Sequence, residues 1–452
     1  MAEEPADSPV KRHASALLRR TFLATWLGAA VGVACGVASA AFLLLLERAT
    51  AFRVAHEAIV YALPAAGLVI GFVYERWGKS IKGGNNLIID TIHTMPEGAP
   101  QLPLRMAPMV LVGTVLTHVF GGSAGREGTA VQMGASLADA IAHRFAVGKD
   151  TRRQLLAAGI AGGFGSVFGT PVAGAIFGLE VVAIGFVEYD AILPALLASV
   201  VGNFVTLRLG VVHAVYPTIA HVELTALVFG KLCVMGVAMA LVTIAFVELT
   251  HRTKAFLEAK IPRLPIRMFA GGIAIVVMWR LIGTSDYLGL GVPTILRAFS
   301  DPDLPWFAFA AKLVFTVVTL SAGFLGGEVT PLFFVGATLG SVLARVLGLP
   351  IELGAGLGIA AVFGAAANTP IALSIMTVEL LGGNALPHAL IVAVIAYILT
   401  GHRGIYPAQR LFRRKHSGRL LKRSVALRDY RDSMPAHGDD EDEAKRNHED
   451  PR

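Results

Sequence analysis

The chain has 452 residues, of which 54% are hydrophobic and 16% are charged. An ordinary soluble protein carries about 25% charged residues, so most of this chain is expected to face lipid or buried protein. The net charge of +7 does not indicate a nucleic-acid partner, because Lys and Arg cluster beside apolar segments, where they orient helices and contact anionic lipid. Cys35 and Cys233 both lie inside apolar segments and support neither a disulfide framework nor a cysteine-based metal site.

Long apolar runs predict helices that cross a membrane, since about 20 apolar residues span a bilayer as a helix. In chain order these runs cover residues 21–46, 109–120, 192–207, 226–247 and 386–399. With the shorter runs included, we expect on the order of a dozen or more membrane helices, many of them short. The 49 glycines fit close helix packing and broken helices.

Basic residues mark both ends of the apolar region. Lys11, Arg12, Arg19 and Arg20 precede a first run that is too long for a signal peptide and lacks a convincing cleavage site, so a retained helix is expected. A second cluster follows the last run and comprises Arg403, Arg410, Arg413, Arg414, Lys415, Arg419, Lys422 and Arg423. Both termini are therefore predicted to be cytoplasmic, with membrane lipid as a partner.

The predicted organisation has three parts. Residues 1–20 form a cytoplasmic segment, residues 21–411 form the membrane domain, and residues 412–452 form a charged cytoplasmic tail. The tail has too few apolar residues to form a core and is expected to be disordered.

An internal repeat divides the membrane domain into halves of about 21–215 and 216–411, as many transporters are divided. Gly125, Gly134, Ala135 and Leu137 recur as Gly327, Gly336, Ala337 and Leu339. Ile160, Ala161, Phe164, Gly165, Thr170, Pro171, Ala173, Ile176 and Glu180 reappear in order as Ile359, Ala360, Phe363, Gly364, Thr369, Pro370, Ala372, Ile375 and Glu379. Halves inserted in opposite senses would meet near the membrane midplane.

The first motif, residues 121–129, is Gly-rich and separates two apolar runs. A helix that starts at membrane depth presents free N–H groups and the positive end of its dipole, which makes an anion site. Glu127 lies at that start, so its carboxylate could occupy the site and leave when it is protonated or displaced. The alternative is a structural acid that pairs with Arg126 or caps the helix.

The repeat partner is Gly326-Gly327-Glu328-Val329-Thr330-Pro331, which again precedes an apolar helix. Two helix starts would then converge on one point. Glu328 is either a second ionisable participant or the cap of its own helix.

Two further segments offer hydrogen-bond donors. Asn85 and Asn86 follow Gly84 at a predicted helix start, where their amides either cap the helix or donate to a small anion. Tyr406, just beyond the last apolar run, offers a hydroxyl donor or belongs to an interfacial aromatic belt.

Together these motifs resemble, in order and approximate spacing, those of the CLC chloride channels and transporters, over about residues 21–411. The resemblance implies an all-α integral membrane fold with an inverted repeat of two halves built from broken and short helices, and a homodimer in which each subunit has its own pore. It also implies that Glu127 is the external gating and proton-coupling glutamate. The implied anion-binding residues are Gly84, Asn85, Asn86, Gly125, Arg126, Gly128, Thr129, Glu328, Val329, Thr330 and Tyr406.

Departures from the chloride pattern are similar to the bacterial fluoride-exporting branch. Thr129 replaces the usual Pro, Asn85 stands at the selectivity position, and the second-half motif carries Glu328, Val329 and Thr330. Val181 stands where proton-coupled chloride members generally carry an inner acid, so proton passage is predicted to rely on Glu127.

The resulting prediction is a fluoride/proton antiporter of the bacterial inner membrane that exports fluoride and uses no cofactor or metal. The alternatives are a passive anion channel or a chloride/proton exchanger of the same fold. A membrane enzyme using Asp90, His93, Glu97 or His118 is less favoured, because their spacing is not that of a metal site.

Overall fold

The computed structural model describes residues 9–96, 99–413, 415 and 420–433. Within these residues the membrane domain consists of two sets of eight helices that follow one another in matching order. The first set is α1 (Pro9–Ala55), α2 (Leu63–Trp77), α3 (Asn85–Thr94), α4 (Met106–Val119), α5 (Glu127–Arg144), α6 (Lys149–Phe168), α7 (Pro171–Glu180) and α8 (Ile192–Arg208). The second set is α9 (Ala226–Lys260), α10 (Leu264–Ile282), α11 (Val292–Arg297), α12 (Ala308–Ala322), α13 (Val329–Leu347), α14 (Ile351–Ala367), α15 (Pro370–Leu381) and α16 (Leu386–Leu399).

Short elements complete the described chain. The 3-10 turns are η1 (Glu57–Ala62), η2 (Lys79–Ile81), η3 (Tyr189–Ala191) and η4 (Gly383–Ala385). Three strands, β1 (Ala183–Ile184), β2 (Arg410–Arg413) and β3 (Leu420–Ala426), precede the last helix, α17 (Leu427–Ser433). These strands form one small sheet in the order β1-β2-β3, so the predicted all-α class holds for the membrane domain, with a minor sheet added.

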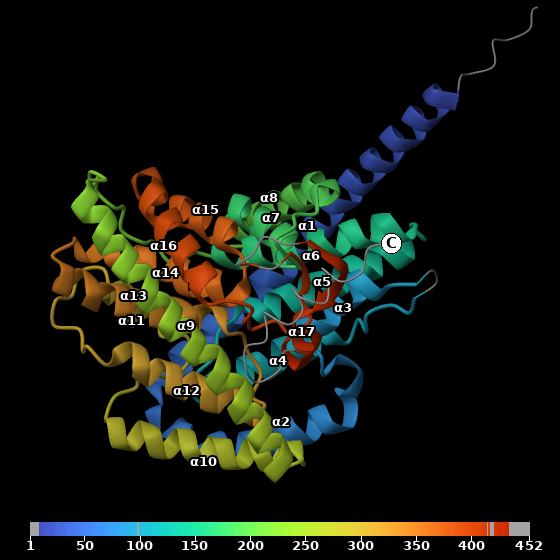
Figure 1. Cartoon of the computed structure of the whole chain (residues 1–452). Coiled ribbons are helices and arrows are strands. Elements are labelled where there is room, and N and C mark those ends of the chain that lie inside the picture. The colour runs from blue at the N-terminus through green and yellow to red at the C-terminus, as the bar shows by residue number, and fades with distance from the viewer. Residues whose placement is uncertain (1–8, 97–98, 414, 416–419, 434–452) are drawn as a thin grey trace, which may run out of the picture.

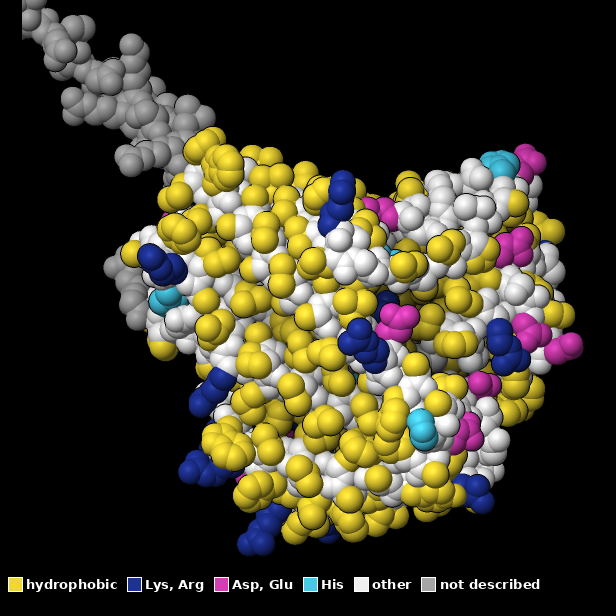
Figure 2. Space-filling view, turned by 180° about the vertical axis from the view of Figure 1, so that it is seen from behind, with side chains coloured by type: hydrophobic (Ala, Val, Ile, Leu, Met, Phe, Trp, Pro, Cys, Tyr) yellow, Lys and Arg dark blue, Asp and Glu magenta, His cyan; other side chains and the backbone are white. Residues whose placement is uncertain are grey.

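Six of the described helices are long and apolar enough to cross a membrane, and several others are short, as predicted. Large hydrophobic side chains are exposed along them, and Figure 2 shows apolar side chains over much of one face. α1 begins at residue 9, which is 12 residues before the predicted apolar run. Pro9 suits a first helical position, and the following Ala, Leu, Lys and Arg residues are good helix formers.

Equivalent segments of the two halves meet across the centre of the molecule. Gly125 N–H donates to Gly327 O over 2.6 Å, and Gly327 N–H donates to Gly125 O over 2.8 Å, in an antiparallel bridge. The equivalent rings of Phe164 and Phe363 stack with centroids 6.3 Å apart. The chain therefore runs in opposite directions at equivalent points, which is the geometry of an inverted repeat.

Helices α2 and α10 lie side by side along one edge of the molecule (Figure 1). Their glycines let the backbones approach: a Cβ on Gly71 would lie 2.6 Å from Pro265 Cα, and one on Gly272 would lie 2.7 Å from Pro64 Cα. The contact is reciprocal, because each Gly meets the Pro of the other half.

The start of each of the helices α7 and α15 is hydrogen bonded to a glutamate side chain of the other helix. Glu180, at the end of α7, accepts from the N–H groups of Ile371 and Ala372 at 3.3 and 2.9 Å. Glu379, in α15, accepts from the N–H groups of Val172 and Ala173 at 2.9 and 2.8 Å. Each half thus satisfies the free N–H groups of a helix start in the other half.

The prediction of a disordered tail at residues 412–452 is wrong for β3 and α17. These residues need no core of their own, because β3 pairs with β2 and the side chains of Leu427 and Tyr430 pack against Ile184 and Leu411. Residues 434–452 lie outside the described part of the chain.

Candidate anion site at two helix starts

The carboxylate of Glu127 is fully buried at the point where α5 and α13 begin. Its Oε2 accepts from Arg126 N–H at 3.0 Å and from Thr330 N–H at 3.1 Å. Its Oε1 accepts from the Thr330 hydroxyl and lies 3.5 Å from Arg126 Nε. The negative group therefore lies on N–H donors from both halves, where the helix dipoles favour an anion.

The backbone before each helix explains this meeting. The two hydrogen bonds between Gly125 and Gly327 hold the helix starts together, and a Cβ on Gly125 would lie 2.8 Å from Glu127 Oε2 and 2.9 Å from Gly327 O. Only glycine allows backbone and carboxylate to approach this closely.

Glu328 occupies the N-cap position of α13, yet its side chain makes no capping hydrogen bond. Its Oε2 lies 3.9 Å from the position of a Cβ on Gly128, so the carboxylate is directed toward the start of α5. This geometry favours the reading of Glu328 as a participant over the reading as a cap. Val329 is buried in the first turn of the same helix.

Asn85 and Gly84 approach the site from α3. Gly84 has a φ of +53°, which favours glycine, and a Cβ there would lie 3.3 Å from Gln132 Nε2 on α5. Asn85 Nδ2 lies 3.2 Å from the position of a Cβ on Gly128, and Asn85 Oδ1 is buried without a hydrogen-bond partner in the described residues. The Asn85 amide thus faces the start of α5 and does not cap α3.

Asn86 has a different neighbour. Its Oδ1 accepts from Ala408 N–H at 3.0 Å, which joins α3 to the segment that carries Tyr406. Tyr406 is buried and within electrostatic range of the carboxylates of Glu328 and Glu127, so its place is not that of an aromatic belt residue. Ile405 N–H donates to Ala366 O at 2.9 Å and fixes this segment on α14.

Sequence reasoning missed a polar connection behind Glu127. The hydroxyls of Thr129 and Thr114 are hydrogen bonded over 2.7 Å, both fully or almost fully buried. His118, also buried, has Nδ1 2.8 Å from Thr114 O and Nε2 3.0 Å from Ala124 O. The sequence signal for this connection was a pair of polar residues, Thr114 and His118, four residues apart in an apolar helix. Gln132, four residues after Gly128, was a second polar residue on the face of a predicted helix near the site.

Arg126 and His213 lie on the side of Glu127 toward the connection between α8 and α9. The Arg126 side chain is 20% exposed, and His213 packs so that a Cβ on Gly169 would lie 2.6 Å from its ring. Burial lowers the pKa of His213 to about 4, and the charge of Arg126 acts in the same direction. His213 is therefore neutral near pH 7.

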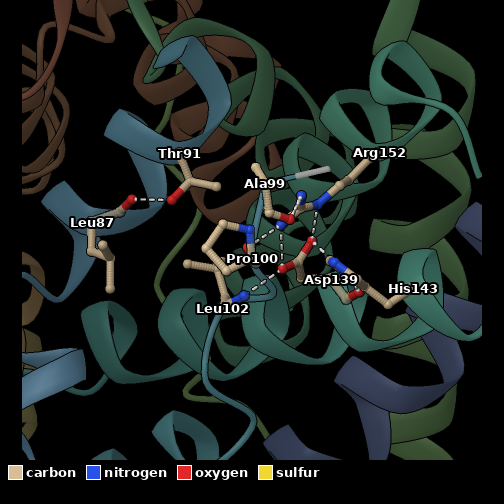
Figure 3. Close-up of polar contacts among 8 residues, drawn as sticks. All are labelled: Leu87, Thr91, Ala99, Pro100, Leu102, Asp139, His143 and Arg152. Carbon is tan, nitrogen blue, oxygen red and sulfur yellow. Dashed lines mark hydrogen bonds and ion pairs between the residues drawn. The ribbon is translucent and has the colours of Figure 1, made fainter. Parts of the chain in front are cut away.

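Farther along α5, Asp139 forms a buried ion pair with Arg152 of α6. Figure 3 shows Arg152 reaching both the Asp139 carboxylate, at 2.6 and 2.9 Å, and the carbonyl oxygens of Ala99 and Pro100. Asp139 also accepts from Leu102 N–H at 2.6 Å. The chain that follows α3 is thereby fixed to α5, the helix that carries Glu127.

Val181, where coupled chloride members carry an acid, is buried, and its carbonyl accepts from Gln409 Nε2 at 2.8 Å. His93 is hydrogen bonded to Val182 O, and no group of three or more His, Cys, Asp or Glu side chains in the described residues could hold a metal ion. Glu97 lies outside the described residues.

Comparison with known proteins identifies the family of this chain. Residues 66–401 match the family described as voltage gated chloride channel. The chain is 46% identical over 418 residues to a chloride/fluoride channel protein of Pseudomonas syringae pv. tomato, covering 90% of this chain and 91% of that one.

Solved structures give the same fold. A CLC-type fluoride/proton antiporter superposes with a TM-score of 0.83 at 35% identity, covering 90% of this chain and 100% of that one. A slow cyanobacterial Cl−/H+ antiporter superposes with a TM-score of 0.72 at 17% identity, over 84% of this chain and 94% of that one, and supports the fold alone. The predicted family is confirmed, and the chain belongs to the CLC family of membrane ion-transport proteins, described as voltage gated chloride channels.

Proposed function

We propose that this protein exports fluoride across the bacterial inner membrane in exchange for protons, as a homodimer with both termini in the cytoplasm. The single observation that carries the proposal is the Glu127 carboxylate on the N–H and O–H donors of two opposed helix starts. The likeness to a fluoride/proton antiporter at 35% identity supports the choice of ion.

Exchange follows from competition for the same donors. A carboxylate and a fluoride ion are both small, hard acceptors of charge-assisted hydrogen bonds, so only one of them can take the Thr330 and Arg126 N–H groups at a time. Protonation of Glu127 removes its charge and weakens its hold on these donors. Fluoride then enters as the neutral acid leaves with its proton.

The donor set fits a strongly hydrated ion. Fluoride gives up tightly bound water only where several N–H and O–H groups replace it, and Asn85, Tyr406 and the helix starts provide such groups. The buried Asn85 amide, directed toward Gly128, is the side chain to which we assign selectivity over chloride. Because Glu127 is already bonded to Thr330, Glu328 is the group proposed to receive Glu127 when it turns further inward.

Proton coupling gives export its driving force. In a one-for-one exchange, outward fluoride and inward proton together move two charges, which supplies roughly 4.6 kcal/mol per 100 mV of membrane potential. At a membrane potential of about 100 mV, this energy sustains roughly a 2000-fold fluoride concentration gradient.

The test is transport by purified protein in liposomes, with a fluoride electrode outside and a pH-sensitive dye inside. An imposed pH gradient should drive fluoride uphill, and chloride should move far more slowly. Glu127→Gln should abolish proton movement and leave any remaining fluoride flux insensitive to pH. Glu75→Gln, which changes an exposed acid on α2, is the matched control and should behave as the unmodified protein.

Three results would overturn the proposal. Fluoride flux that only runs downhill indicates a passive channel, and equal chloride and fluoride exchange indicates a chloride/proton exchanger. Proton coupling that survives in Glu127→Gln assigns the proton carrier to another group.

A further inference from the structure

Helix α17 lies against both elements that bring donors to the candidate anion site from the Tyr406 side. The Arg428 guanidinium makes two hydrogen bonds of 3.0 Å with the Asp90 carboxylate on α3. Asp90 is one helical turn after Asn86, so both side chains lie on the same face of α3. One turn of α3 therefore meets residue 408, and the next meets α17.

The same helix is bonded to the segment that carries Tyr406. Arg428 N–H donates to Pro407 O at 3.0 Å, and Leu427 N–H donates to Gln409 O at 2.8 Å. Since Ala408 N–H donates to Asn86, the start of α3, residues 406–409 and α17 form a closed ring of contacts.

A second anchor ties α17 to the long helix α9. Arg431 Nη2 donates to Glu248 at 2.6 Å, and Arg403 donates to the same carboxylate at 3.0 Å. The Tyr430 side chain is buried with Ile184 and Leu411. The α17 helix is thus held independently of α3, which lets Arg428 act as a fixed support.

We propose that Arg428 is a positioning residue for the anion site. Its side chain holds Asp90 on α3 and its backbone N–H holds the carbonyl of Pro407, and together these contacts set the separation between Asn85 and Tyr406. The inference rests on the proposed function, because Asn85 and Tyr406 are assigned there as fluoride donors. A small ion is sensitive to this separation, since a hydrogen bond weakens steeply as its donor moves away. The Arg428–Asp90 pair lies one helical turn beyond Asn86 on α3, so its effect reaches fluoride only through the position of α3.

The chain offers a closely matched control pair. Arg428 and Asp90 have side chains 46% and 26% exposed, and Arg297 and Asp301 form a pair that is 47% and 25% exposed. In the control pair, Arg297 is the last residue of α11 and Asp301 follows four residues later. Within the part of the chain that the structure describes, this pair has no contact with α3 or with residues 406–409. Arg297 also lies 3.6 Å from Asp286, so its loss should weaken local ion pairs without moving α3 or residues 406–409.

The experiment compares initial fluoride efflux against internal fluoride for the unmodified protein, Arg428→Gln, Arg297→Gln and the charge swap Asp90→Arg with Arg428→Asp. We expect Arg428→Gln to raise KM about fivefold with kcat changed by less than about twofold, the size expected for a partly exposed pair. Arg297→Gln should leave KM unchanged, and the charge swap should return KM to within about twofold of the original. Added potassium gluconate should raise the KM of the unmodified protein toward that of Arg428→Gln, which itself should not respond.

A KM for Arg428→Gln equal to that of the unmodified protein or of Arg297→Gln would overturn the inference. A fall in kcat with unchanged KM, together with failed rescue by the charge swap, would also overturn it by showing a general packing role. Monodisperse elution in size-exclusion chromatography verifies that each variant folds. Absence of any fluoride transport by the unmodified protein would instead refute the proposed function.

Discussion

Replacing Gly128 with Ala tests where the anion binds. A methyl group at this position would lie 3.2 Å from Asn85 Nδ2 and from Gly327 Cα, and 3.9 Å from Glu328 Oε2. Contacts of 3.2 Å are tighter than ordinary van der Waals contact, so the neighbours must give by a few tenths of an ångström. The methyl would fill the space in front of the Asn85 amide.

The expected damage is to binding rather than to folding. Gly128 lies in the first turn of α5, where alanine is favoured over glycine by roughly 0.5–1 kcal/mol in a helix, which offsets part of the crowding. Loss of one charge-assisted hydrogen bond to the ion costs about 1.5–3 kcal/mol. This cost corresponds to a roughly 10- to 150-fold loss of affinity, so KM for fluoride should rise by at least about tenfold.

Fluoride-electrode recordings of efflux from proteoliposomes, at a series of internal fluoride concentrations, measure this KM. Gly230→Ala is the matched control, because a Cβ there meets no atom within 4 Å. An unchanged KM in folded Gly128→Ala protein would show that the ion does not bind between Asn85 and the start of α5.

Three further predictions concern stability. Thr129→Val should lower the free energy of unfolding by about 1–3 kcal/mol, because it leaves the buried Thr114 hydroxyl without its partner. The double variant with Thr114→Val and Thr129→Val should recover part of that loss, as measured by thermal unfolding. Glu379→Ala should lower it by about 1–2 kcal/mol by leaving the start of α7 uncapped, whereas Glu379→Gln, which keeps an acceptor, should lower it less. Burial lowers the pKa of Lys415, which lies beyond the last membrane helix, from 10.5 to about 7. Between these two values the unfolded chain binds one more proton than the folded chain, so the free energy of unfolding should rise with pH in this window. As the pH falls, this contribution should be lost by about pH 7.

Each of these has a clear contrary result. Equal melting temperatures for Thr129→Val and the unmodified protein would show that the hydroxyl pair contributes nothing. Equal losses in Glu379→Ala and Glu379→Gln would assign the effect to charge rather than to capping. A Lys415→Met variant that retains the full rise of stability between about pH 7 and pH 9 would place the titrating group elsewhere.

The parts of this fold that depend on nearby residues could be predicted from the sequence. Apolar runs located α8, α9 and α16 to within a few residues at their starts, and Gly-rich stretches located the starts of α3, α5 and α13. The repeat identified Gly125 with Gly327 and Glu180 with Glu379 as equivalent pairs. Helix formation, capping and backbone freedom act within about one turn of chain, so one sequence carries their signals.

The tertiary structure alone decided which of these groups meet. The sequence did not reveal that Glu180 and Glu379 cap each other's helices or that Thr129 pairs with Thr114. It also did not reveal that the start of α13 is bonded to Glu127 rather than to its own N-cap residue, Glu328. The sequence also predicted disorder for the residues that form α17, because they have too little apolar surface to form a core of their own. That surface is nevertheless enough for α17 to pack on the existing cluster of Ile184 and Leu411. Contacts between residues hundreds of positions apart depend on the packing of all the helices together, and no local pattern encodes them.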